Sequence, residues 1–206
     1  MPDPIALGID TSAAHCAAAL LCGDALLTLR HEEMAKGQAE RLMPMLQEML
    51  AEAGLGWRDL AVIGVGTGPG NFTGIRVAVA AARALALALQ VPAVGVSVPE
   101  ALALDLPRPC RIVIPGRRGS VIWQDFGVRD RDDRGVDGQA GDHPRQAEDG
   151  ALPPGPKAAV PLHPLPVAIA RIALARRRSP GPRPAPLYLR PADAAPARDP
   201  APIILP

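Results

Sequence analysis

Apolar residues near the start of the chain come in three short runs, with turn-forming residues between them. The runs span residues 5–9, 17–21 and 25–29, and Asp-Thr-Ser and Gly-Asp lie in the intervals between them. Short apolar runs punctuated in this way are typical of antiparallel strands joined by tight connections. We therefore predict a three-stranded meander at the start of the chain.

The segment that follows alternates between helical and extended patterns. Residues 36–53 repeat apolar side chains every three or four positions, which predicts an amphipathic helix that Pro44 bends near its front. The pattern then predicts a buried strand over residues 60–65, a second helix over residues 74–90 and a fifth strand over residues 93–96. This order of elements is that of a ribonuclease-H-like α/β domain, in which helices connect parallel strands.

Proline content divides the chain into two parts. Residues 1–100 hold 6 prolines, whereas residues 101–206 hold 19. Because frequent prolines interrupt regular structure, we predict a well-formed first lobe over residues 1–98 and a diverged, shortened second lobe over residues 99–206.

The second lobe has weaker patterns than the first. We expect its one helix to belong to a truncated second folding unit. The predicted elements are a hairpin from residues 111–114 and 121–126, a loop over residues 127–161, a helix over residues 167–177, and a proline-rich tail over residues 179–206 in which only PLYLR forms a strand.

Composition and charge narrow the functional classes. Aromatic residues make up only 2% of the chain, so the stacking platforms of single-stranded nucleic-acid binding proteins are nearly absent. The formal charge of +1 conceals a split, because residues 1–100 carry 6 Lys/Arg and 10 Asp/Glu, whereas residues 101–206 carry 16 and 11. The first part is acidic and the second part is basic.

The cysteines and the N-terminus indicate the compartment. Cys16, Cys22 and Cys110 lie in apolar surroundings without CxxC spacing, which predicts reduced thiols rather than disulfides or a zinc site. The opening MPDPIALGID lacks a basic region and a long apolar segment, and no run reaches the roughly 20 residues that a membrane helix needs. We expect a cytoplasmic protein without a membrane span.

A glycine-rich stretch, GVGTGPGNFTGIRVA, lies between a predicted strand and a predicted helix, where backbone N–H groups and the helix dipole can hold an anion. Its spacing fits neither GxxxxGK[ST] nor GxGxxG. We favour a compact turn with glycines at positive φ, stiffened by Pro69 and followed by a capped helix; a phosphate cradle is the alternative. The glycines are Gly66, Gly68 and Gly70, and the candidate caps are Asn71 and Thr73.

Asp10, Thr11 and Ser12 end the first predicted strand. In phosphotransferases of this architecture a carboxylate here organises metal and phosphates, but no lysine or glycine pair follows Ser12. We favour a turn whose side chains bond their own backbone, with a phosphate and metal site as the alternative.

The four histidines lack HxxxH or HExxH spacing, which disfavours a helix-borne metal site. The basic run at residues 176–178 is interpreted as a solvated helix end, or alternatively as an RNA phosphate contact.

Five segments together resemble the TsaB family of tRNA threonylcarbamoyladenosine biosynthesis subunits: ALGIDTS, KGQAERLMPMLQEML, GVGTGPGNFTGIRVAVA, PAVGVS and PLYLR. The similarity is continuous over residues 5–104. It implies an actin/Hsp70/sugar-kinase-like fold with two ribonuclease-H-like lobes. It also implies a non-catalytic paralogue of TsaD.

The resemblance implies a role in a complex. TsaD binds metal and nucleotide and transfers threonylcarbamoyl from threonylcarbamoyl-AMP to N6 of the adenosine beside the anticodon, in tRNAs reading codons that begin with A. This chain is then a scaffold or activator that pairs with TsaD, works with the ATPase TsaE, reaches tRNA through the complex and forms a homodimer when alone. No cofactor is expected to bind it tightly, because ATP and metal belong to the partners.

The same resemblance suggests site residues. It implies a pairing surface on the helices predicted over residues 36–53 and 74–90. The candidates on that surface are Arg41, Leu42, Met45, Arg76, Val79, Ala80 and Arg83. The positions of a vestigial phosphate loop are Asp10, Thr11, Ser12, Gly68, Gly70 and Thr73.

The chain departs from the family pattern mainly in its second lobe. Pro115, Ser120 and Ile122 replace an aspartate, an acidic or amide residue and a tyrosine, and Gln38 stands where some members have histidine. We hypothesise that pairing needs mainly the first lobe, so that a chain ending near residue 105 still binds TsaD. The rival functions are a small-molecule kinase or ATPase of the same fold, favoured only by Asp10 and the glycine loop, and a metallopeptidase, disfavoured by the absence of paired histidines.

Overall fold

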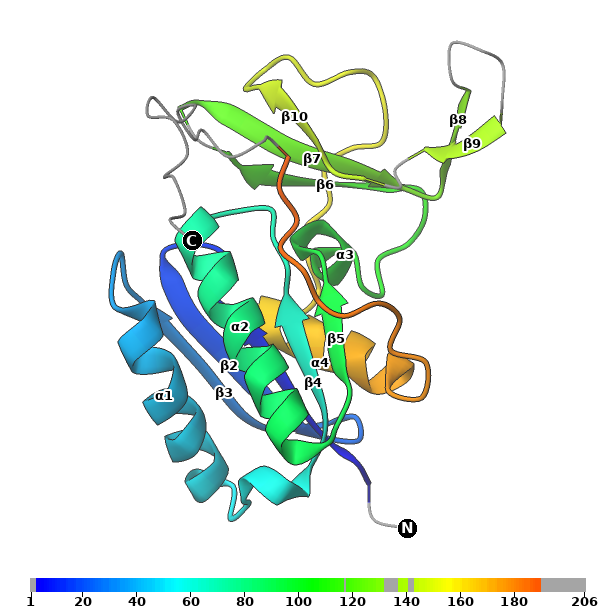
Figure 1. Ribbon diagram of the computed structural model, residues 1–206. Helices are drawn as coiled ribbons and strands as arrows, with labels where there is room; N and C mark the ends of the chain where they lie inside the picture. Colours follow the sequence, from blue (N-terminus) through cyan, green and yellow to red (C-terminus); the bar gives the residue numbers. More distant parts are fainter. Residues whose placement is uncertain (1–2, 117, 132–136, 141–142, 190–206) are drawn as a thin grey trace, which may run out of the picture.

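The computed structural model describes residues 3–116, 118–131, 137–140 and 143–189, and it is built on a five-stranded sheet (Figure 1). The antiparallel order of the first three strands and the parallel pairing of the last two confirm the predicted ribonuclease-H-like arrangement. The sheet has the order β3-β2-β1-β4-β5, with β1 (Ile5–Asp10), β2 (His15–Cys22), β3 (Ala25–Glu33), β4 (Leu60–Gly66) and β5 (Ala93–Val96).

Helices cover both faces of this sheet. On one face lie α1 (Gln38–Glu52), which continues through Pro44, and α2 (Phe72–Leu89), whereas α4 (Leu165–Arg176) lies on the other (Figure 1). Alternate residues of a strand pack against the helices on opposite faces of the sheet: Leu7 packs with α1 and α2, and Ala6 packs with α4. Burial on both faces explains why the strands read as continuous apolar runs.

The close approach of α4 depends on two glycines that are paired in register across β1 and β4. A Cβ atom on Gly8 would overlap the carbonyl oxygen of Pro166 and lie 2.8 Å from the backbone nitrogen of Ala170. A Cβ atom on Gly64 would lie 2.8 Å from the carbonyl oxygen of Ile169. The helix backbone therefore rests directly on the strands.

The expectation that this helix belongs to a second folding unit is wrong. Its residues Val167, Ile169 and Ile172 form one core cluster with the first sheet. A chain ending near residue 105 lacks α4 and exposes that face, so the truncation hypothesised above does not leave an intact first lobe. The boundary at residue 98 stays a prediction.

The second sheet is small and antiparallel, in the order β10-β7-β6. It confirms the predicted hairpin with β6 (Cys110–Pro115) and β7 (Ser120–Phe126), and the buried Arg111 donates from Nε and Nη2 to Asp125 at 2.6 and 2.7 Å. The prediction of a loop over residues 127–161 is wrong in part. That segment contains β8 (Val128–Arg131), β9 (Asp137–Ala140) and β10 (Arg145–Glu148).

The segment after α4 runs back across the first lobe. Its described part, residues 179–189, contains no strand, so the strand predicted for PLYLR is wrong at residues 186–189; Arg190 and the rest of the tail lie outside the described residues. Leu187 donates its backbone N–H to the carbonyl of Thr67 at 2.8 Å, which joins this segment to the glycine loop. Two short helices were not predicted, η1 (Trp57–Asp59) and α3 (Val98–Leu102).

By length and composition, α2 is the single helix in the described ranges able to cross a membrane, with a mean hydropathy of 1.6 over Phe72–Leu89. Sequence patterns did not lead us to expect such a span. Its residues Ile75, Ala78 and Val79 belong to the core beneath the sheet. The helix is therefore packed within this domain. This packing accounts for the apolar residues that face the sheet but not for those on the opposite, exposed side of the helix.

All three cysteines are free, which confirms the prediction of reduced thiols. Cys16 is buried and Cys22 is half-buried. Burial, together with the nearby negative charge of Glu32, raises the pKa of the Cys16 thiol to about 11. This thiol stays protonated at neutral pH.

Alkylation of the native protein at about pH 8 is expected to modify Cys22 first and Cys16 about 100-fold more slowly, because only the thiolate reacts. Peptide mass spectrometry after timed exposure measures both rates, and the same reaction in denaturant is the control. The native pKa lies above the ordinary value of 9.0, so stability from the neutral thiol is present below pH 9 and is lost as the pH rises toward 11. Equal labelling of both cysteines in the native state contradicts this account.

Candidate partner-binding surface

Asp10 lies at the turn between β1 and β2 and is fully buried. Its Oδ1 accepts hydrogen bonds from the backbone N–H of Ser12 at 3.0 Å, from the Ser12 hydroxyl at 2.8 Å and from His15 Nε2 at 2.7 Å. The first bond, between the Asp10 side chain and the turn backbone, confirms the predicted self-bonded turn. Asp10 Oδ2 has no hydrogen-bond partner among the described residues.

The glycine loop packs directly against this turn. Thr11 donates its hydroxyl to the carbonyl of Gly74 at 2.6 Å, and Asn71 donates its backbone N–H to the carbonyl of Ser12 at 2.6 Å. A Cβ atom on Gly70 or on Gly74 would overlap a carbonyl oxygen of the turn. The space in which a phosphate would approach the loop is therefore occupied by the protein's own backbone.

The start of α2 has little left to offer an anion. Asn71 caps the helix, since its Oδ1 accepts from the backbone N–H groups of Thr73 at 3.1 Å and Gly74 at 3.4 Å. Because anion sites at helix starts use free N–H groups, this cap favours the structural interpretation of the loop.

The prediction of three positive φ angles in the loop is wrong for two of the glycines. Only Gly68 adopts one, at 94°. Gly66 and Gly70 are needed for close approach, since a Cβ on Gly66 would overlap Asp10 Oδ2 and one on Gly70 would overlap the backbone of Ser12. Glycine serves two separate purposes in this loop.

Three of the predicted interface residues are core residues. Leu42, Met45 and Val79 are 1%, 0% and 3% exposed and belong to the cluster between the helices and the sheet. Their assignment to a pairing surface is wrong, because a partner docking on the outside cannot reach them.

The outer face of α2 is apolar and uncovered. Only 28% of the helix is buried, and Leu87 is 66% exposed. The helix contains no Asp or Glu, and its only charged residues are Arg76 and Arg83. The exposed positions recur on one side, and we call them the α2 outer face: Thr73, Arg76, Ala80, Arg83, Ala84, Leu87 and Ala88.

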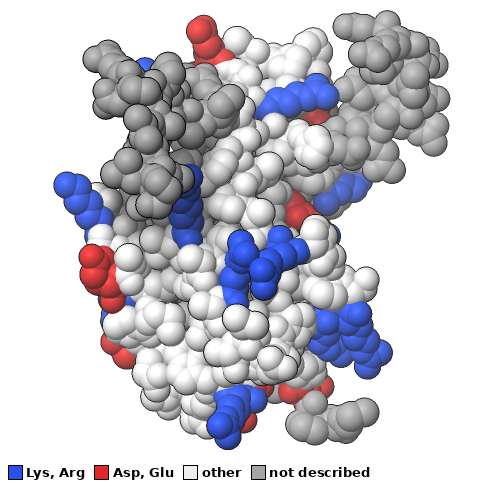
Figure 2. Space-filling view, viewed as in Figure 1, with Lys and Arg blue, Asp and Glu red and all other residues white. Residues whose placement is uncertain are grey.

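Figure 2 shows the side of the molecule that carries α1 and α2. Uncharged atoms cover most of it, basic side chains gather near the middle, and acidic side chains lie mainly toward the margins. On α1, Met43 is also an exposed apolar side chain. A face of this kind on a helix that also packs in the core is typical of a protein–protein contact.

Arg41 and Arg76 are both held in place. Arg41 makes bidentate contacts with Glu32 and Glu48, all at 2.7 Å, and these ion pairs lower the pKa of both carboxyl groups. Arg76 donates from Nε to the Tyr188 hydroxyl at 2.8 Å and lies 3.7 Å from the centre of the Phe72 ring. Sequence reasoning missed His15 and Tyr188. His15 contacts Asp10, only five residues away, whereas Tyr188 contacts Arg76, which is distant in sequence. The PLYLR motif was the one available signal for Tyr188.

A family model agrees with this architecture over most of the chain. The model described as "TsaD: tRNA N6-adenosine threonylcarbamoyltransferase" matches residues 31–166. The chain belongs to this TsaD family. Membership in the TsaD family, together with the two-faced sheet, confirms the predicted actin-like α/β fold class.

Relatives within the TsaD family support the TsaB resemblance. The TsaB proteins of Haemophilus influenzae and Escherichia coli are 37% and 34% identical over 68 residues, 33% of this chain. The matched region spans 28% and 29% of those curated relatives.

Two solved structures are similar over nearly the whole chain. YeaZ from Pseudomonas aeruginosa superposes with a TM-score of 0.69 at 26% identity, over 90% of this chain and 100% of that one. A second structure, of a protein with similarity to peptidase YeaZ from Pseudomonas aeruginosa, gives a TM-score of 0.70 at 25% identity, over 91% and 100%. The similarity therefore includes the second sheet.

Proposed function

We propose that this chain is a non-catalytic scaffold subunit that pairs with TsaD and supports threonylcarbamoyl transfer from threonylcarbamoyl-AMP to N6 of the adenosine beside the anticodon. The α2 outer face is the observation that carries this proposal. An apolar helix face beside a rigid core offers binding area at little conformational cost. The TsaB names of the curated relatives support TsaD as the partner.

The packing around Asp10 supports a non-catalytic role. The carboxylate that would organise metal and phosphates is bonded by Ser12 and His15, and the glycine loop is closed by backbone contacts. An imidazole held on Oδ1 competes for the same oxygen that a metal ion would need.

One observation favours the rival, a kinase or ATPase of the same fold. Asp10 Oδ2 is buried without a hydrogen-bond partner in the described residues, and an unpaired buried carboxylate oxygen is costly. A bound cation would satisfy it. The contact of Gly66 with this oxygen leaves no room on that side, which favours the scaffold.

Two titrations separate these functions. We expect the chain to bind purified TsaD and to show no heat of binding and no phosphate release with Mg-ATP alone. An Asp10→Asn variant, which keeps the shape of the side chain, is expected to bind TsaD as the wild type does. Mg-ATP turnover that disappears in Asp10→Asn would establish the rival instead.

The remaining assignments follow from this role. We expect ATP and metal to reside on TsaD and on the ATPase TsaE, so that this chain binds no cofactor tightly by itself. In the absence of TsaD, the α2 outer face is expected to pair with a second copy. Contact with tRNA is made through the complex, and the complex works in the cytoplasm.

A further inference from the structure

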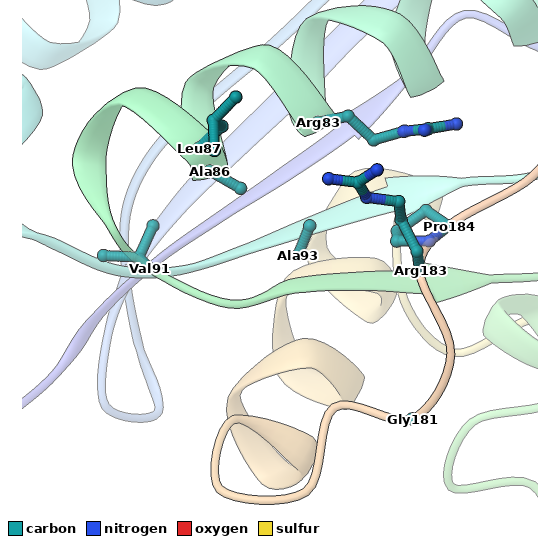
Figure 3. A pocket seen from close by; sticks show the side chains of 8 residues that line it. All are labelled: Arg83, Ala86, Leu87, Val91, Ala93, Gly181, Arg183 and Pro184. Carbon is teal, nitrogen blue, oxygen red and sulfur yellow. The ribbon is translucent and has the colours of Figure 1, made fainter.

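A pocket lies where the C-terminal half of α2, β5 and the segment after α4 meet. Its cavity volume is about 320 Å³, it is open to solvent, and its surface is polar and apolar in equal parts. Arg183 points from the segment after α4 toward α2, and Arg83 extends sideways from α2; Ala86 of α2 and Ala93 of β5 also line the cavity (Figure 3). We call this cavity the two-arginine pocket.

Neither guanidinium of the pocket has a hydrogen bond or ion pair within the described part of the chain. Other arginines of this lobe do, since Arg30 contacts Glu52 and Arg41 contacts Glu32 and Glu48. No Asp or Glu lines the cavity. Two cations that line one pocket repel each other, and a bound anion offsets this repulsion because it is attracted to both of them.

The pocket continues the α2 outer face. Leu87 and Arg83 belong to both. Any protein that covers α2 therefore closes the pocket at the same time. Arginine at the margin of an apolar contact is a frequent anchor, because its planar group binds carboxylates through two parallel hydrogen bonds.

We propose that the two-arginine pocket receives a carboxylate side chain of the TsaD subunit that docks on α2. The inference rests on the proposed function, and it adds an anchor that fixes the register of the partner on the helix. Leu87 and Pro184 line the pocket beside the arginines, so a docked partner that covers them also shields each charge-assisted hydrogen bond from water.

The surroundings favour a protein carboxylate over an RNA phosphate. No aromatic residue lines the cavity to stack a base, and its walls apart from the two arginines are apolar. Surfaces that bind the RNA backbone carry extended rows of cations, because affinity grows with the number of phosphates neutralised. Only two cations, Arg83 and Arg183, line this open pocket.

The test compares Arg83→Glu/Arg183→Glu with the wild type in calorimetric titrations with TsaD. The matched control is Lys157→Glu/Arg178→Glu, which makes the same change in charge at exposed positions outside the pocket and outside α2. We expect affinity for TsaD to fall about tenfold or more in the pocket variant and to change less than about twofold in the control. Arg83→Lys/Arg183→Lys keeps the charges without the planar groups and is expected to lie between them.

The outcomes are distinct. If the wild type does not bind TsaD, the proposed function fails and the inference falls with it. If the wild type binds and the pocket variant binds equally well, the function stands and the inference is overturned. A pocket variant that loses only tRNA affinity or only self-association, with TsaD affinity unchanged, also overturns it. Circular dichroism and the melting temperature confirm that each variant is folded.

Discussion

Replacement of Gly8 by alanine is expected to lower the free energy of unfolding by about 3 kcal/mol or more, a large fraction of the stability of a domain this size. The new methyl group overlaps the carbonyl oxygen of Pro166 and lies 2.8 Å from the backbone nitrogen of Ala170. Backbone atoms of a packed helix cannot turn aside as a flexible side chain does, so α4 must move away from β1.

Chemical denaturation followed by circular dichroism measures this loss. Gly64→Ala is expected to act in the same way, because its methyl group would lie 2.8 Å from Ala173 Cβ. Gly56→Ala is the matched control, since its methyl group would lie 3.7 Å from Asp59 Oδ2, an ordinary contact. A Gly8→Ala protein that unfolds at the same denaturant concentration as the wild type would show that α4 does not rest on this sheet.

Glutamate at Ala80 and Ala84 is expected to weaken binding to TsaD about 100-fold while leaving the fold intact, because an unpaired charge buried in an apolar contact is costly. Both alanines are exposed on the α2 outer face. The adjacent Val79 is 3% exposed, so Val79→Glu is expected to unfold the protein instead. Glutamate is therefore expected to unfold the protein at position 79 and to weaken only TsaD binding at position 80.

Size-exclusion chromatography with TsaD and thermal melting of each variant measure the two effects. Ala175→Glu is the control, since it makes the same substitution at an exposed position of α4, on the other side of the sheet. Co-elution of Ala80→Glu/Ala84→Glu with TsaD at wild-type levels would show that the partner binds elsewhere.

Sequence periodicity was sufficient to predict the strands of the first sheet, because each strand is specified by residues that are neighbours in the sequence. Each strand and helix over residues 5–96 has its own apolar run and its own turn residues, and Asn71 was correctly named as a candidate cap. The position of α4 was not predictable in this way. Its contact with Gly8 joins residues far apart in the chain, and a glycine in a strand does not indicate which element packs against it.

The docking face was only partly predictable because α2 is apolar on nearly every side. Periodicity distinguishes a core face only when the opposite face is polar. Here Val79 and Ala80 have similar side chains, and only the packing against the sheet separates the core residue from the exposed one. Leu42 and Met45 lie on the amphipathic α1 and were assigned to the surface by the family resemblance, against the periodicity that places them on the apolar side.

Segments without a pattern were the hardest to predict. The polar strand β10 has the sequence RQAE and forms by pairing with β7, so no apolar alternation announces it. Arg83 and Arg183 line the same pocket only because the segment after α4 returns to α2. Such contacts depend on the tertiary fold and leave no local signal.

The central claim is that this chain supports TsaD through the outer face of α2. The most direct measurement is the amount of threonylcarbamoyladenosine formed on tRNA by TsaD and TsaE, with this chain as the only TsaB-type subunit. We predict that the wild type and Ala175→Glu restore the modification and that Ala80→Glu/Ala84→Glu does not. Modification that is independent of this chain, or that the α2 variant restores equally well, would contradict the account.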